Sequence, residues 1–505
     1  MEAFDVLETL QEPRSATLVG SLVTPLDQLT AAAREHFDAL DVLEVRADLA
    51  GDLKASDLRQ WFRGRLLYTL RSSSEWGQGP DAAAERAPRL LQAAAGYDYV
   101  DLEANRDLTA EVLEGVPPRQ RLLSWHGAHD ADLRGVLERM DAYEAAVRKL
   151  VVLAQADSQE VAVMTLLCEC RDQGRSDVVA FAAGDCGTWT RLVAPRVGLP
   201  WVYVALDQAA APGQLSLAQA LRDYGLPSLP PARRVFGILG RPVSHSLSPR
   251  LHNGGYRATE TEALYLPFHA ERFADFWMDT VEIGIFDRLG LPLEGLSVTT
   301  PYKEPALAVA GASSPRAARL RAGNTLLLRK GVWECVSTDP EGVVVPLQRL
   351  GVSLEGAPAA VVGCGGAGRA AALGLRECGA EVSVVNRTEE KGRMTAERLG
   401  LEFIPLAELD PSRYQVMVQA TALGSDASDP LPWSVESMRD DAVLVEMVYR
   451  SGETPLEGAA RARGLRTIGG RQVLLFQGLE QFRLMVGREL DAELGGALLG
   501  LEEAR

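Results

Sequence analysis

The stretch "APAAVVGCGGAGRAAALGLRECGAEVSVVNRT", residues 357–388, decides the fold of the C-terminal part of this 505-residue chain. It has the pattern of a strand, a glycine-rich turn, a helix and a second strand. Glycines at such a turn let the backbone approach a pyrophosphate, and the N-terminus of the following helix favours the negative charge of that group. The pattern therefore predicts a Rossmann βαβ unit that binds a dinucleotide.

The residues expected to hold the dinucleotide lie in the turn and at the end of the second strand. They are Gly363, Gly365, Gly366, Ala367, Gly368, Asn386, Arg387 and Thr388. An NAD site typically carries Asp or Glu after the second strand, whereas this chain has Asn386 and Arg387 there. A cation at this point fits the 2′-phosphate of NADP, so we predict NADP as the cofactor. The alternative is that Arg387 is an ordinary surface residue.

Short β-type runs alternate with helical stretches in the N-terminal part of the chain. The eight runs cover residues 16–22, 42–49, 65–72, 99–105, 121–127, 148–154, 178–184 and 201–206. Eight βα units within about 220 residues are typical of a (β/α)8 TIM barrel, whose active site lies at the C-terminal ends of its strands. The sequence thus predicts an α/β protein that begins with a TIM barrel.

A proline-rich stretch, "YGLPSLPPARR" (224–234), marks a boundary between two globular parts. We expect a TIM barrel over residues 1–225, a linker over 226–233 and a smaller α/β domain over 234–340. The Rossmann domain is expected over 341–470. Helical apolar spacing in "QVLLFQGLEQFRLMVGRELDAEL" (472–494) predicts a C-terminal helical segment, residues 471–505, that packs back on the smaller domain.

The composition argues against several classes of function. The formal net charge of −17 does not suit a nucleic-acid partner, whose phosphates demand a basic surface. No apolar run reaches the ~20 residues that span a bilayer, and the N-terminus "MEAFDVLETLQEPRS" lacks the basic and apolar regions of a signal peptide. We therefore expect no membrane partner and a cytoplasmic location. The six cysteines include no CxxC and the six histidines no HExxH, which predicts reduced thiols and no metal site.

Lysine is rare in this chain, since only five of the 52 Lys and Arg residues are lysine. One of them, Lys149, lies in the apolar run "AAVRKLVVLA" (145–154). A buried amine can lose its proton, which a guanidinium effectively cannot, and a neutral amine can attack a carbonyl to form a Schiff base. His126, on the neighbouring run, is a group that moves protons near neutral pH. The alternative is that the amine of Lys149 reaches solvent at a strand end.

The motifs "EVRAD", "TLRSSSE", "SWHGAHD", "VRKLVV" and "APGQ" together resemble type I 3-dehydroquinate dehydratase over roughly residues 15–225. The resemblance implies that 3-dehydroquinate is dehydrated to 3-dehydroshikimate through an imine on Lys149, with His126 as acid and base and Glu75 in support of the histidine. It also implies that the substrate is held by Glu44, Arg46, Arg71, Arg191 and Gln214. Ala182 and Ala210 depart from the family, where serine is usual, and we expect lost hydroxyl contacts there.

The stretches "GRPVSHSLSPRLHN" (240–253), "SVTTPYKEPAL" (297–307), "RAGNTLLL", "VSTDPEG", "MVYRSGETPL" and "GGRQVLLFQG" resemble shikimate dehydrogenase over roughly residues 234–490. The resemblance implies NADPH-dependent reduction of 3-dehydroshikimate to shikimate, with Lys303 and Asp339 as the acid–base pair. The implied substrate ligands are Ser246, Ser248, Thr299, Asn324 and Gln477. Thr421, Tyr449 and Gly470 are expected near the nicotinamide. The family pattern is not met at Ser297, Ser337, Glu446 and Val473, which leaves shikimate and quinate both open as substrates.

Taken together, the two resemblances predict a bifunctional enzyme that acts on small anions and whose assembly state is open, a homodimer included. Three alternatives remain at this point. Only one half is active, or the dehydrogenase half accepts quinate, or the chain is a catalytically dead regulator that binds NADP. For Lys303 the alternative to catalysis is a solvated lysine in a loop.

Overall fold

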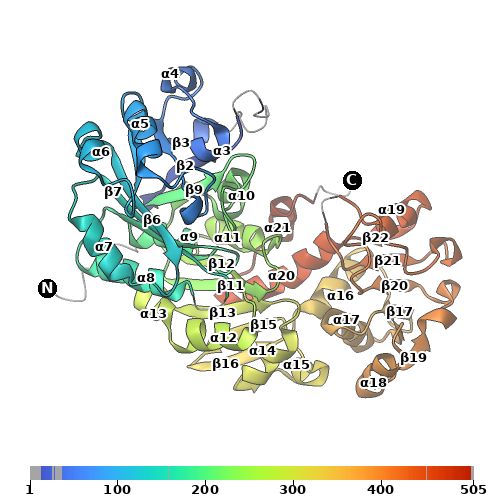
Figure 1. Cartoon of the computed structure of the whole chain (residues 1–505). Helices are drawn as coiled ribbons and strands as arrows, with labels where there is room; N and C mark the ends of the chain where they lie inside the picture. Colours follow the sequence, from blue (N-terminus) through green and yellow to red (C-terminus); the bar gives the residue numbers. More distant parts are fainter. Residues whose placement is uncertain (1–12, 26–27, 29–36, 157–158, 451, 502–505) are drawn as a thin grey trace. The chain divides into compact units, whose positions relative to one another are not determined.

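The computed structural model describes residues 13–25, 28, 37–156, 159–450 and 452–501 (Figure 1). Most of the N-terminal stretch considered for a signal peptide lies outside the described residues. Two compact units are present. The first runs to Gly237 and adds Arg241–Ser246 and Glu262–Leu293; the second comprises Ile238–Gly240, Leu247–Thr261 and the chain from Glu294 onward.

An eight-stranded parallel sheet forms the centre of the first unit and confirms the predicted barrel (Figure 1). In chain order its strands are β2 (Thr17–Leu22), β3 (Val42–Arg46), β4 (Arg65–Thr69), β5 (Tyr99–Glu103), β6 (Arg121–Ala128), β7 (Val147–Leu153), β8 (Val178–Ala183) and β9 (Trp201–Ala205). Their order in the sheet is β8-β7-β6-β5-β4-β3-β2-β9, so each strand of β2–β8 lies beside its neighbour in sequence and β9 returns to β2. The barrel is nearly closed.

Helices follow most of the barrel strands, as the βα alternation predicts. They are α3 (Ala47–Ala50), α4 (Ala55–Leu58), α5 (Ala83–Ala94), α6 (Ala110–Gly115), α7 (Leu133–Asp141), α8 (Val161–Asp172), α9 (Thr190–Val197) and α10 (Leu217–Tyr224). Two strands are shorter than their predicted runs by three residues. β3 ends at Arg46 because the chain turns into α3, and β4 ends at Thr69, so that residues 70–75 form a turn over the end of the barrel.

The chain between the barrel and the Rossmann domain is again mixed α/β. Its elements up to Leu293 are β11 (Arg234–Gly240), α11 (Ser248–Ala258), β12 (Ala263–His269), α12 (Phe273–Phe276) and α13 (Ile285–Leu289). They are followed by β13 (Leu293–Val298), α14 (Lys303–Val309), β14 (Ala312–Ser313), α15 (Pro315–Leu320), β15 (Thr325–Arg329) and β16 (Val332–Val336). β13 and β15 pair antiparallel, and so do β15 and β16, with Lys330 and Gly331 at the tip of that hairpin.

A six-stranded parallel sheet forms the C-terminal half of the second unit and confirms the Rossmann fold. Its strands are β17 (Pro358–Val362), β18 (Glu381–Asn386), β19 (Glu402–Pro405), β20 (Val416–Gln419), β21 (Val443–Glu446) and β22 (Arg466–Ile468). Their order is β19-β18-β17-β20-β21-β22. The order reverses between β17 and β20, and open α/β sheets bind their ligands at the carboxyl ends of the strands beside such a reversal.

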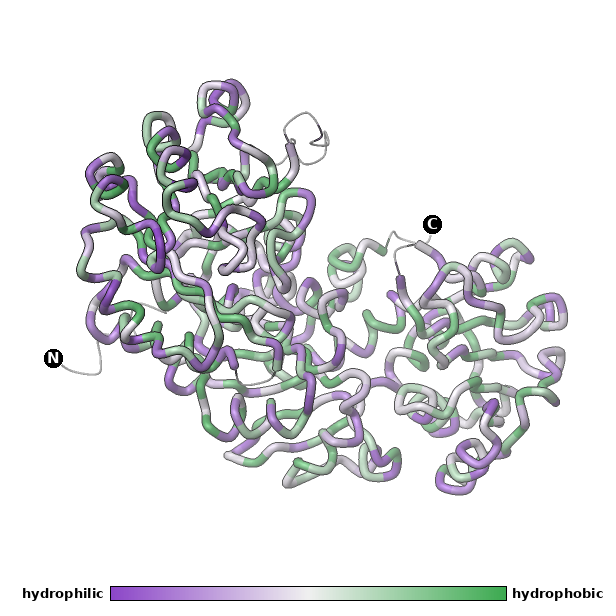
Figure 2. Tube along the Cα trace, viewed as in Figure 1, coloured by the Kyte–Doolittle hydropathy of each residue, from purple (hydrophilic) through white to green (hydrophobic). Residues whose placement is uncertain are grey.

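Helices α16 (Asp339–Arg349), α17 (Gly366–Glu377), α18 (Glu389–Leu399), α19 (Pro455–Ala462) and the start of α20 (Gly470–Val486) cover this sheet and bury its apolar strands, which show green in Figure 2. The last helix, α21 (Ala492–Leu498), packs on α20 and α11. The continuous helical pattern expected over 472–494 is broken, because Gly487 adopts a φ of +69° and ends α20. Among the described residues, no helix combines the length and the apolar character that crossing a bilayer requires.

Candidate active sites

A cavity of about 310 Å³ lies at the C-terminal ends of the barrel strands. Every residue that the sequence assigned to the dehydration site lines it: Glu44, Arg46, Arg71, Glu75, His126, Lys149, Arg191 and Gln214. Parallel barrel strands deliver their last side chains to one face, which is why residues far apart in sequence meet here.

Lys149 projects from β7 into this cavity, and its residue is only 5% exposed. Its Nζ atom lies 3.9 Å above the centre of the Tyr203 ring and 3.9 Å from Oε1 of Glu44. Burial lowers the pKa of Lys149 to about 8, although the carboxylates of Glu44 and Asp101 act in the opposite direction. A fraction of the amine is therefore unprotonated near neutral pH, and a side chain this buried does not fit the solvent-exposed alternative.

The carboxylate of Glu44 is held by hydroxyls from the two neighbouring strands. Ser21 Oγ donates to Oε2 at 2.6 Å, and Thr69 Oγ1 donates to Oε1 at 2.9 Å. Burial opposes ionisation of this group, but the charges of Lys149 and Arg46 and the two hydrogen bonds outweigh it, so the pKa of Glu44 is lowered. Glu44 is thus a fixed anion beside the lysine.

His126 of β6 is oriented by Glu75, the last residue of a 3-10 turn over Ser73–Glu75. Its Nδ1 atom and its backbone N–H both lie 3.1 Å from Oε2 of Glu75. Burial, with the positive charges of Arg71 and Lys149, lowers the pKa of His126 well below its ordinary value. The neutral imidazole can accept a proton at Nε2, because Nδ1 faces the carboxyl group of Glu75.

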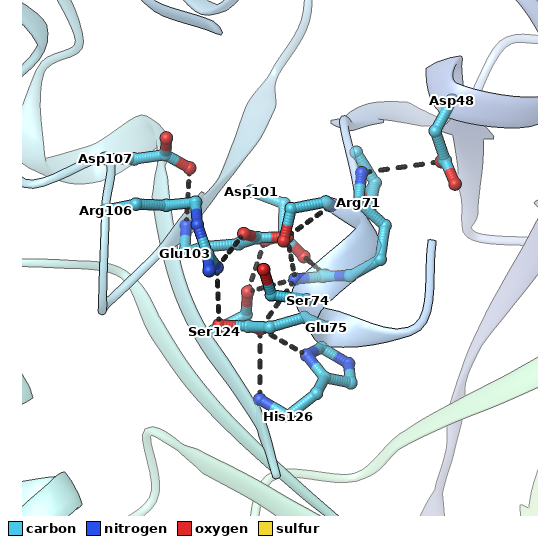
Figure 3. A network of polar contacts seen from close by, with 12 residues as sticks. Asp48, Arg71, Ser74, Glu75, Asp101, Glu103, Arg106, Asp107, Ser124 and His126 are labelled. Carbon is cyan, nitrogen blue, oxygen red and sulfur yellow. Dashed lines mark hydrogen bonds and ion pairs between the residues drawn. The ribbon is translucent and has the colours of Figure 1, made fainter. Parts of the chain in front are cut away.

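Arg71 is the centre of a buried polar network beside the histidine (Figure 3). Its Nη1 atom donates to Ser124 Oγ at 2.9 Å and to Glu103 Oε1 at 3.1 Å, and its Nη2 atom donates to Asp101 Oδ2 at 2.7 Å. Glu75 Oε2 lies 3.3 Å from Nη1. Because Glu75 is buried and shares this arginine with two other carboxylates, its pKa is raised to about 8.

Arg106 closes the network on its outer side. Its Nη1 atom donates to Glu75 Oε1 at 3.1 Å and to Glu103 Oε2 at 2.6 Å. Both oxygens of Glu75 therefore have partners, and the carboxyl group that orients His126 has one fixed position (Figure 3).

The cavity arginines differ in whether their charge is already paired. Arg46 forms a bidentate ion pair with Asp48, at 2.9 and 2.8 Å. Arg191, the second residue of α9, lies 4.4 Å above the Phe181 ring, and within the described part of the chain it has no carboxylate partner. Burial lowers the pKa of Arg191 to about 10. An unpaired buried guanidinium is a ready partner for an anionic ligand.

In the second unit, Lys303 and Asp339 stand at the first positions of α14 and α16 and form an ion pair. Lys303 Nζ donates to Asp339 Oδ2 at 2.5 Å. Asn324 Nδ2 donates to the other oxygen, Oδ1, at 2.9 Å and to Gln477 Oε1 at 3.1 Å. Asn324 is held in turn by the backbone N–H of Thr338 at 2.8 Å. The solvated-loop alternative for Lys303 does not fit a side chain that is 16% exposed and paired.

The glycine-rich turn lies directly beside this lysine. Gly363 has a φ of +116°, and a Cβ atom on Gly368 would lie 2.1 Å from the carbonyl oxygen of Gly363. A Cβ on Gly366 would lie 3.2 Å from Cδ of Lys303, whereas no atom lies within 4 Å of one on Gly365. The turn thus needs glycine for its shape and leaves its outer side open, which suits a bound pyrophosphate. Ala367 follows as the second residue of α17.

The other residues predicted to bind the cofactor follow the carboxyl ends of neighbouring strands. Arg387 is exposed just after β18, and Asn386 Nδ2 donates to the carbonyl of Thr388 at 2.8 Å. Thr421 follows β20, and its N–H donates to Gln419 Oε1 at 2.9 Å. Tyr449, after β21, and Gly470, at the start of α20, line a second cavity of about 530 Å³.

The predicted substrate ligands of this half are divided between the two units. Ser248 starts α11 and is buried, and Thr299 follows β13 with its N–H bonded to the carbonyl of Leu239 at 2.9 Å. Both belong to the second unit, as do Asn324, which contacts Asp339, and Gln477, which contacts Asn324. Ser246 lies in the turn before α11 and belongs to the first unit.

Comparison with known proteins agrees with this geometry. The family model of type I 3-dehydroquinase matches residues 18–228, and that of the shikimate dehydrogenase substrate binding domain matches residues 238–326. The model of the acetohydroxy acid isomeroreductase NADPH-binding domain matches residues 353–421. A shikimate dehydrogenase (NADP(+)) of Syntrophobacter fumaroxidans is 34% identical over 266 residues, which cover 52% of this chain and 90% of that protein. The chain belongs to the shikimate dehydrogenase family.

One relative contains a dehydratase and a dehydrogenase in a single chain. The bifunctional 3-dehydroquinate dehydratase/shikimate dehydrogenase, chloroplastic, of Arabidopsis thaliana is 27% identical over 498 residues, covering 92% of this chain and 80% of that protein. The crystal structure of shikimate dehydrogenase from Aquifex aeolicus shares 30% identity, covers 53% of this chain and 97% of its own, and has a TM-score of 0.49. This chain thus joins a type I 3-dehydroquinase domain to a shikimate dehydrogenase.

The departures from the two family patterns differ in their consequences. In the dehydratase domain Ala210 lines the cavity, whereas Ala182 does not, and its backbone N–H donates to Thr190 Oγ1 at 2.9 Å. Because Ala182 does not line the cavity, the expected loss of a hydroxyl contact with the substrate does not apply at this position. In the dehydrogenase, Ser297 Oγ donates to Gln481 Oε1 at 3.0 Å.

The remaining dehydrogenase departures are buried. Ser337 is 8% exposed, and Val473 of α20 packs against α16, where a Cβ on Gly342 would lie 3.0 Å from Cγ1 of Val473. Glu446 accepts hydrogen bonds from the N–H of Val448 at 2.9 Å and from Thr454 Oγ1 at 3.1 Å, and burial raises its pKa to about 7. None of these side chains replaces a member of the Lys303–Asp339 pair.

Several residues of the dehydratase site were not foreseen from the sequence. Asp101 and Glu103 of β5 pair with Arg71, Tyr203 of β9 lies under Lys149, and Trp76 lines the cavity beside His126. The two acids stand two residues apart in "YVDLEAN", the same spacing that Glu44 and Arg46 show in β3, so this signal was available. The two aromatic residues carried no sequence signal beyond an ordinary core or surface position.

Proposed function

We propose that this chain catalyses two consecutive reactions, the dehydration of 3-dehydroquinate to 3-dehydroshikimate in the barrel and the NADPH-dependent reduction of that product to shikimate in the second unit. The observation that carries the proposal is the contrast between its two catalytic lysines. The amine of Lys149 is buried, with a pKa of about 8, and lies 3.9 Å from Glu44, whereas Lys303 is hydrogen-bonded to Asp339 at 2.5 Å. The first suits a nucleophile and the second a proton donor.

In the barrel, the neutral amine of Lys149 attacks the ketone carbon of the substrate, and water leaves as the C=N bond of the imine forms. His126 then removes a proton from the carbon next to the imine, and the electron pair moves into the C=N bond. The pair returns when the hydroxyl group on the following carbon leaves as water, protonated by His126. Hydrolysis of the imine frees Lys149, so the net change is the loss of one water molecule.

The groups around the lysine bind and orient the substrate. Arg191, whose charge no described carboxylate pairs, receives the substrate carboxylate through parallel N–H bonds. Glu44, Arg46 and Gln214 hold hydroxyl groups at the cavity wall. Glu75 orients His126 directly, and Arg71 holds Glu75 through an ion pair.

In the second unit, the residues present fit NADP. The open glycine turn at Gly363–Gly368 would hold the pyrophosphate, and the exposed Arg387 would pair with the 2′-phosphate. Thr421, Tyr449 and Gly470 would lie on the nicotinamide side. When bound, NADPH supplies the hydride for the ketone. Lys303 gives a proton to the substrate oxygen, and Asp339, held by Asn324, keeps the ammonium in place.

The same proposal includes the division of the chain and its setting. We assign the dehydratase to residues 1–225, the substrate-binding domain to 234–340, the Rossmann domain to 341–470 and a closing helical segment to 471–505. The family matches at 18–228, 238–326 and 353–421 support these limits. A cytoplasmic setting is supported by the six free cysteines, and a homodimer is a prediction that sedimentation analysis tests.

Two assays on one purified chain test the proposal. Formation of the conjugated product is followed by its ultraviolet absorbance, and oxidation of NADPH is followed separately with 3-dehydroshikimate supplied. We expect Lys149→Ala to abolish the first activity and spare the second, and Lys303→Ala to do the reverse. A wild-type chain that lacks either activity, or a single variant that loses both while still folded, would contradict the assignment of two independent sites.

A further inference from the structure

Trp76, the residue after Glu75, has a left-handed backbone with φ 68° and ψ 21°. Among the described residues, four that are not glycine have positive φ, namely Trp76, Glu260, Arg321 and Lys330, and Trp76 alone of these carries a ring. This conformation is ordinarily taken by glycine, because a large L side chain crowds the backbone there. Strained residues of this kind cluster at functional sites.

Backbone hydrogen bonds hold the turn that carries Trp76. The N–H of Trp76 donates to the carbonyl of Ser73 at 3.3 Å, and the N–H of Gly77 donates to that of Ser72 at 2.8 Å. A Cβ atom on Gly77 would lie 2.1 Å from the carbonyl oxygen of Arg71, so the chain folds back tightly on itself. This tight turn places Glu75 under His126. Glycine at position 76 would meet the same requirement without strain, so the presence of an indole calls for a separate reason.

The indole lies where the chemistry takes place. Trp76 lines the cavity of the barrel and remains 43% exposed, and its ring meets the imidazole of His126 edge to face, with centroids 5.9 Å apart and planes at 86°. The imidazole is also tied to Glu75 through Nδ1. The two neighbours together restrict rotation of the imidazole and leave Nε2 toward the cavity.

We propose that Trp76 is a positioning residue for His126: its indole covers the imidazole at the cavity rim, fixes the ring for proton transfer through Nε2 and keeps bulk water from it. This inference rests on the proposed dehydratase function. The left-handed backbone at position 76 disfavours tryptophan. The proposed role predicts that Trp76 increases the rate of dehydration, which balances its cost in backbone strain.

The inference has a consequence for the pH dependence of dehydration. The charged and titratable side chains that act on His126 from the surrounding elements include Arg46, Arg71, Glu75, Lys149 and Arg191, and Glu44 lines the same cavity. All of them remain when the indole is removed, so the change is confined to solvent access. Because burial is the largest factor that depresses the pKa of His126, exposure to water moves this pKa up toward its ordinary value. The acid limb of the kcat profile, measured at saturating substrate so that Lys149 is already in the imine, then moves to higher pH.

The test compares Trp76→Gly with Trp76→Phe in the full chain. We expect W76G to lower kcat of dehydration by about tenfold or more, a smaller loss than removal of the proton-transfer group itself would cause. We also expect the acid limb of the kcat profile to shift to higher pH. W76F keeps a ring against His126 and should retain at least about a third of the activity. Shikimate oxidation by the same chains reports an intact second unit. Folding of the barrel is reported by the unfolding midpoint of W76G, which should change little, since relief of the left-handed strain offsets the lost packing.

Three results would overturn the inference. One is a W76G chain whose dehydration stays within about twofold of a fully active wild type, which would leave the dehydratase assignment itself intact. Another is a W76F chain as impaired as W76G, since the ring would then not be the relevant feature. If W76G does not fold, Trp76→Asn replaces it, because asparagine tolerates the left-handed backbone. The third contradicting result is unimpaired dehydration by Trp76→Asn. A wild type without dehydration would refute the proposed function first.

Discussion

The Nζ atom of Lys149 lies 3.9 Å from Oε1 of Glu44, so the two charges attract each other without sharing a hydrogen bond. By contrast, Lys303 donates to Asp339 at 2.5 Å. The amine of Lys149 is therefore not committed to a protein partner and can attack a substrate carbon, whereas that of Lys303 is hydrogen-bonded to a carboxylate. The two lysines of one chain are placed for different chemistry, and this difference leads to the predictions that follow.

Replacing Lys149 by arginine keeps the positive charge in the barrel but removes the group that forms the imine. We expect Lys149→Arg to lower the rate of dehydration by at least about a thousandfold, because loss of a covalent nucleophile is rarely compensated. Reduction of 3-dehydroshikimate should be unchanged. Lys391→Arg, on the exposed face of α18, is the matched control and should keep both activities. Substantial dehydration by Lys149→Arg would show that no imine is needed.

The carboxylate of Glu44 should control the pH at which Lys149 becomes reactive. Burial lowers the pKa of Lys149, and the charge of Glu44 partly opposes this effect, so that the pKa is about 8. In Glu44→Gln the opposing charge is gone, so the pKa of Lys149 falls further and the amine is deprotonated at lower pH. The rate of imine trapping, measured against pH, should therefore begin to rise at lower pH than in the wild type.

The matched control for this change is Glu138→Gln, an exposed position on α7. It removes one negative charge from the same unit at a distance from the lysine. If both variants move the pH profile equally, the effect belongs to net charge rather than to the neighbour of Lys149.

Glu75 should make the stability of the fold depend on pH. Burial raises its pKa from an ordinary 4.5 to about 8 in the folded state. Above pH 4.5 the unfolded chain releases this proton while the folded chain keeps it, so the contribution of Glu75 to stability is lost as pH rises from 4.5 to 8. In Glu75→Gln this loss is absent, and the wild type should lose up to about 1.4 kcal/mol more per pH unit than the variant.

Unfolding midpoints at several pH values between 5 and 8 measure this difference. Glu111→Gln, an exposed position in the first turn of α6, serves as control and should follow the wild type. Parallel curves for wild type and Glu75→Gln would mean that Glu75 is ionised throughout, with Arg71 and Arg106 outweighing its burial.

The choice of cofactor should depend on Arg387. Reversal of its charge in Arg387→Glu places a carboxylate beside the expected 2′-phosphate, which repels NADP and favours the free ribose hydroxyl of NAD. We expect KM for NADP to rise by about tenfold or more, equivalent to about 1.4 kcal/mol, while NAD becomes the better substrate. The control is Arg393→Glu, because Arg393 lies on α18 and pairs with Glu389; this variant should keep the preference for NADP. An unchanged NADP preference would make Arg387 an ordinary surface residue.

Local patterns were sufficient to predict the elements of both folds. The eight barrel strands and the strand–turn–helix around Gly363 follow from apolar runs and glycine placement, which short stretches of sequence contain. Lys149 and His126 were identified in the same way, because each is a polar residue inside such a run. Gly487 shows the limit of the method, since the helical spacing continues past the residue whose backbone ends the helix.

Long-range contacts were not accessible in this way. Arg71 meets Asp101 and Glu103 only because the barrel brings β4 beside β5, and no local pattern pairs an arginine with acids about 30 residues away. Likewise, the ring of Trp189, just before α9, packs 5.0 Å from that of Phe286 in α13, so the first compact unit extends past the proline-rich stretch at 224–234. Such contacts depend on packing between elements rather than on the pattern within them.

The most direct test of the central claim is to trap the imine. The full chain is treated with borohydride in the presence of 3-dehydroquinate, digested and analysed by mass spectrometry. The account predicts one substrate-derived adduct, on the peptide that contains Lys149, together with lost dehydration and retained reduction of 3-dehydroshikimate. An adduct on another lysine, or full activity after treatment with no adduct, would contradict it.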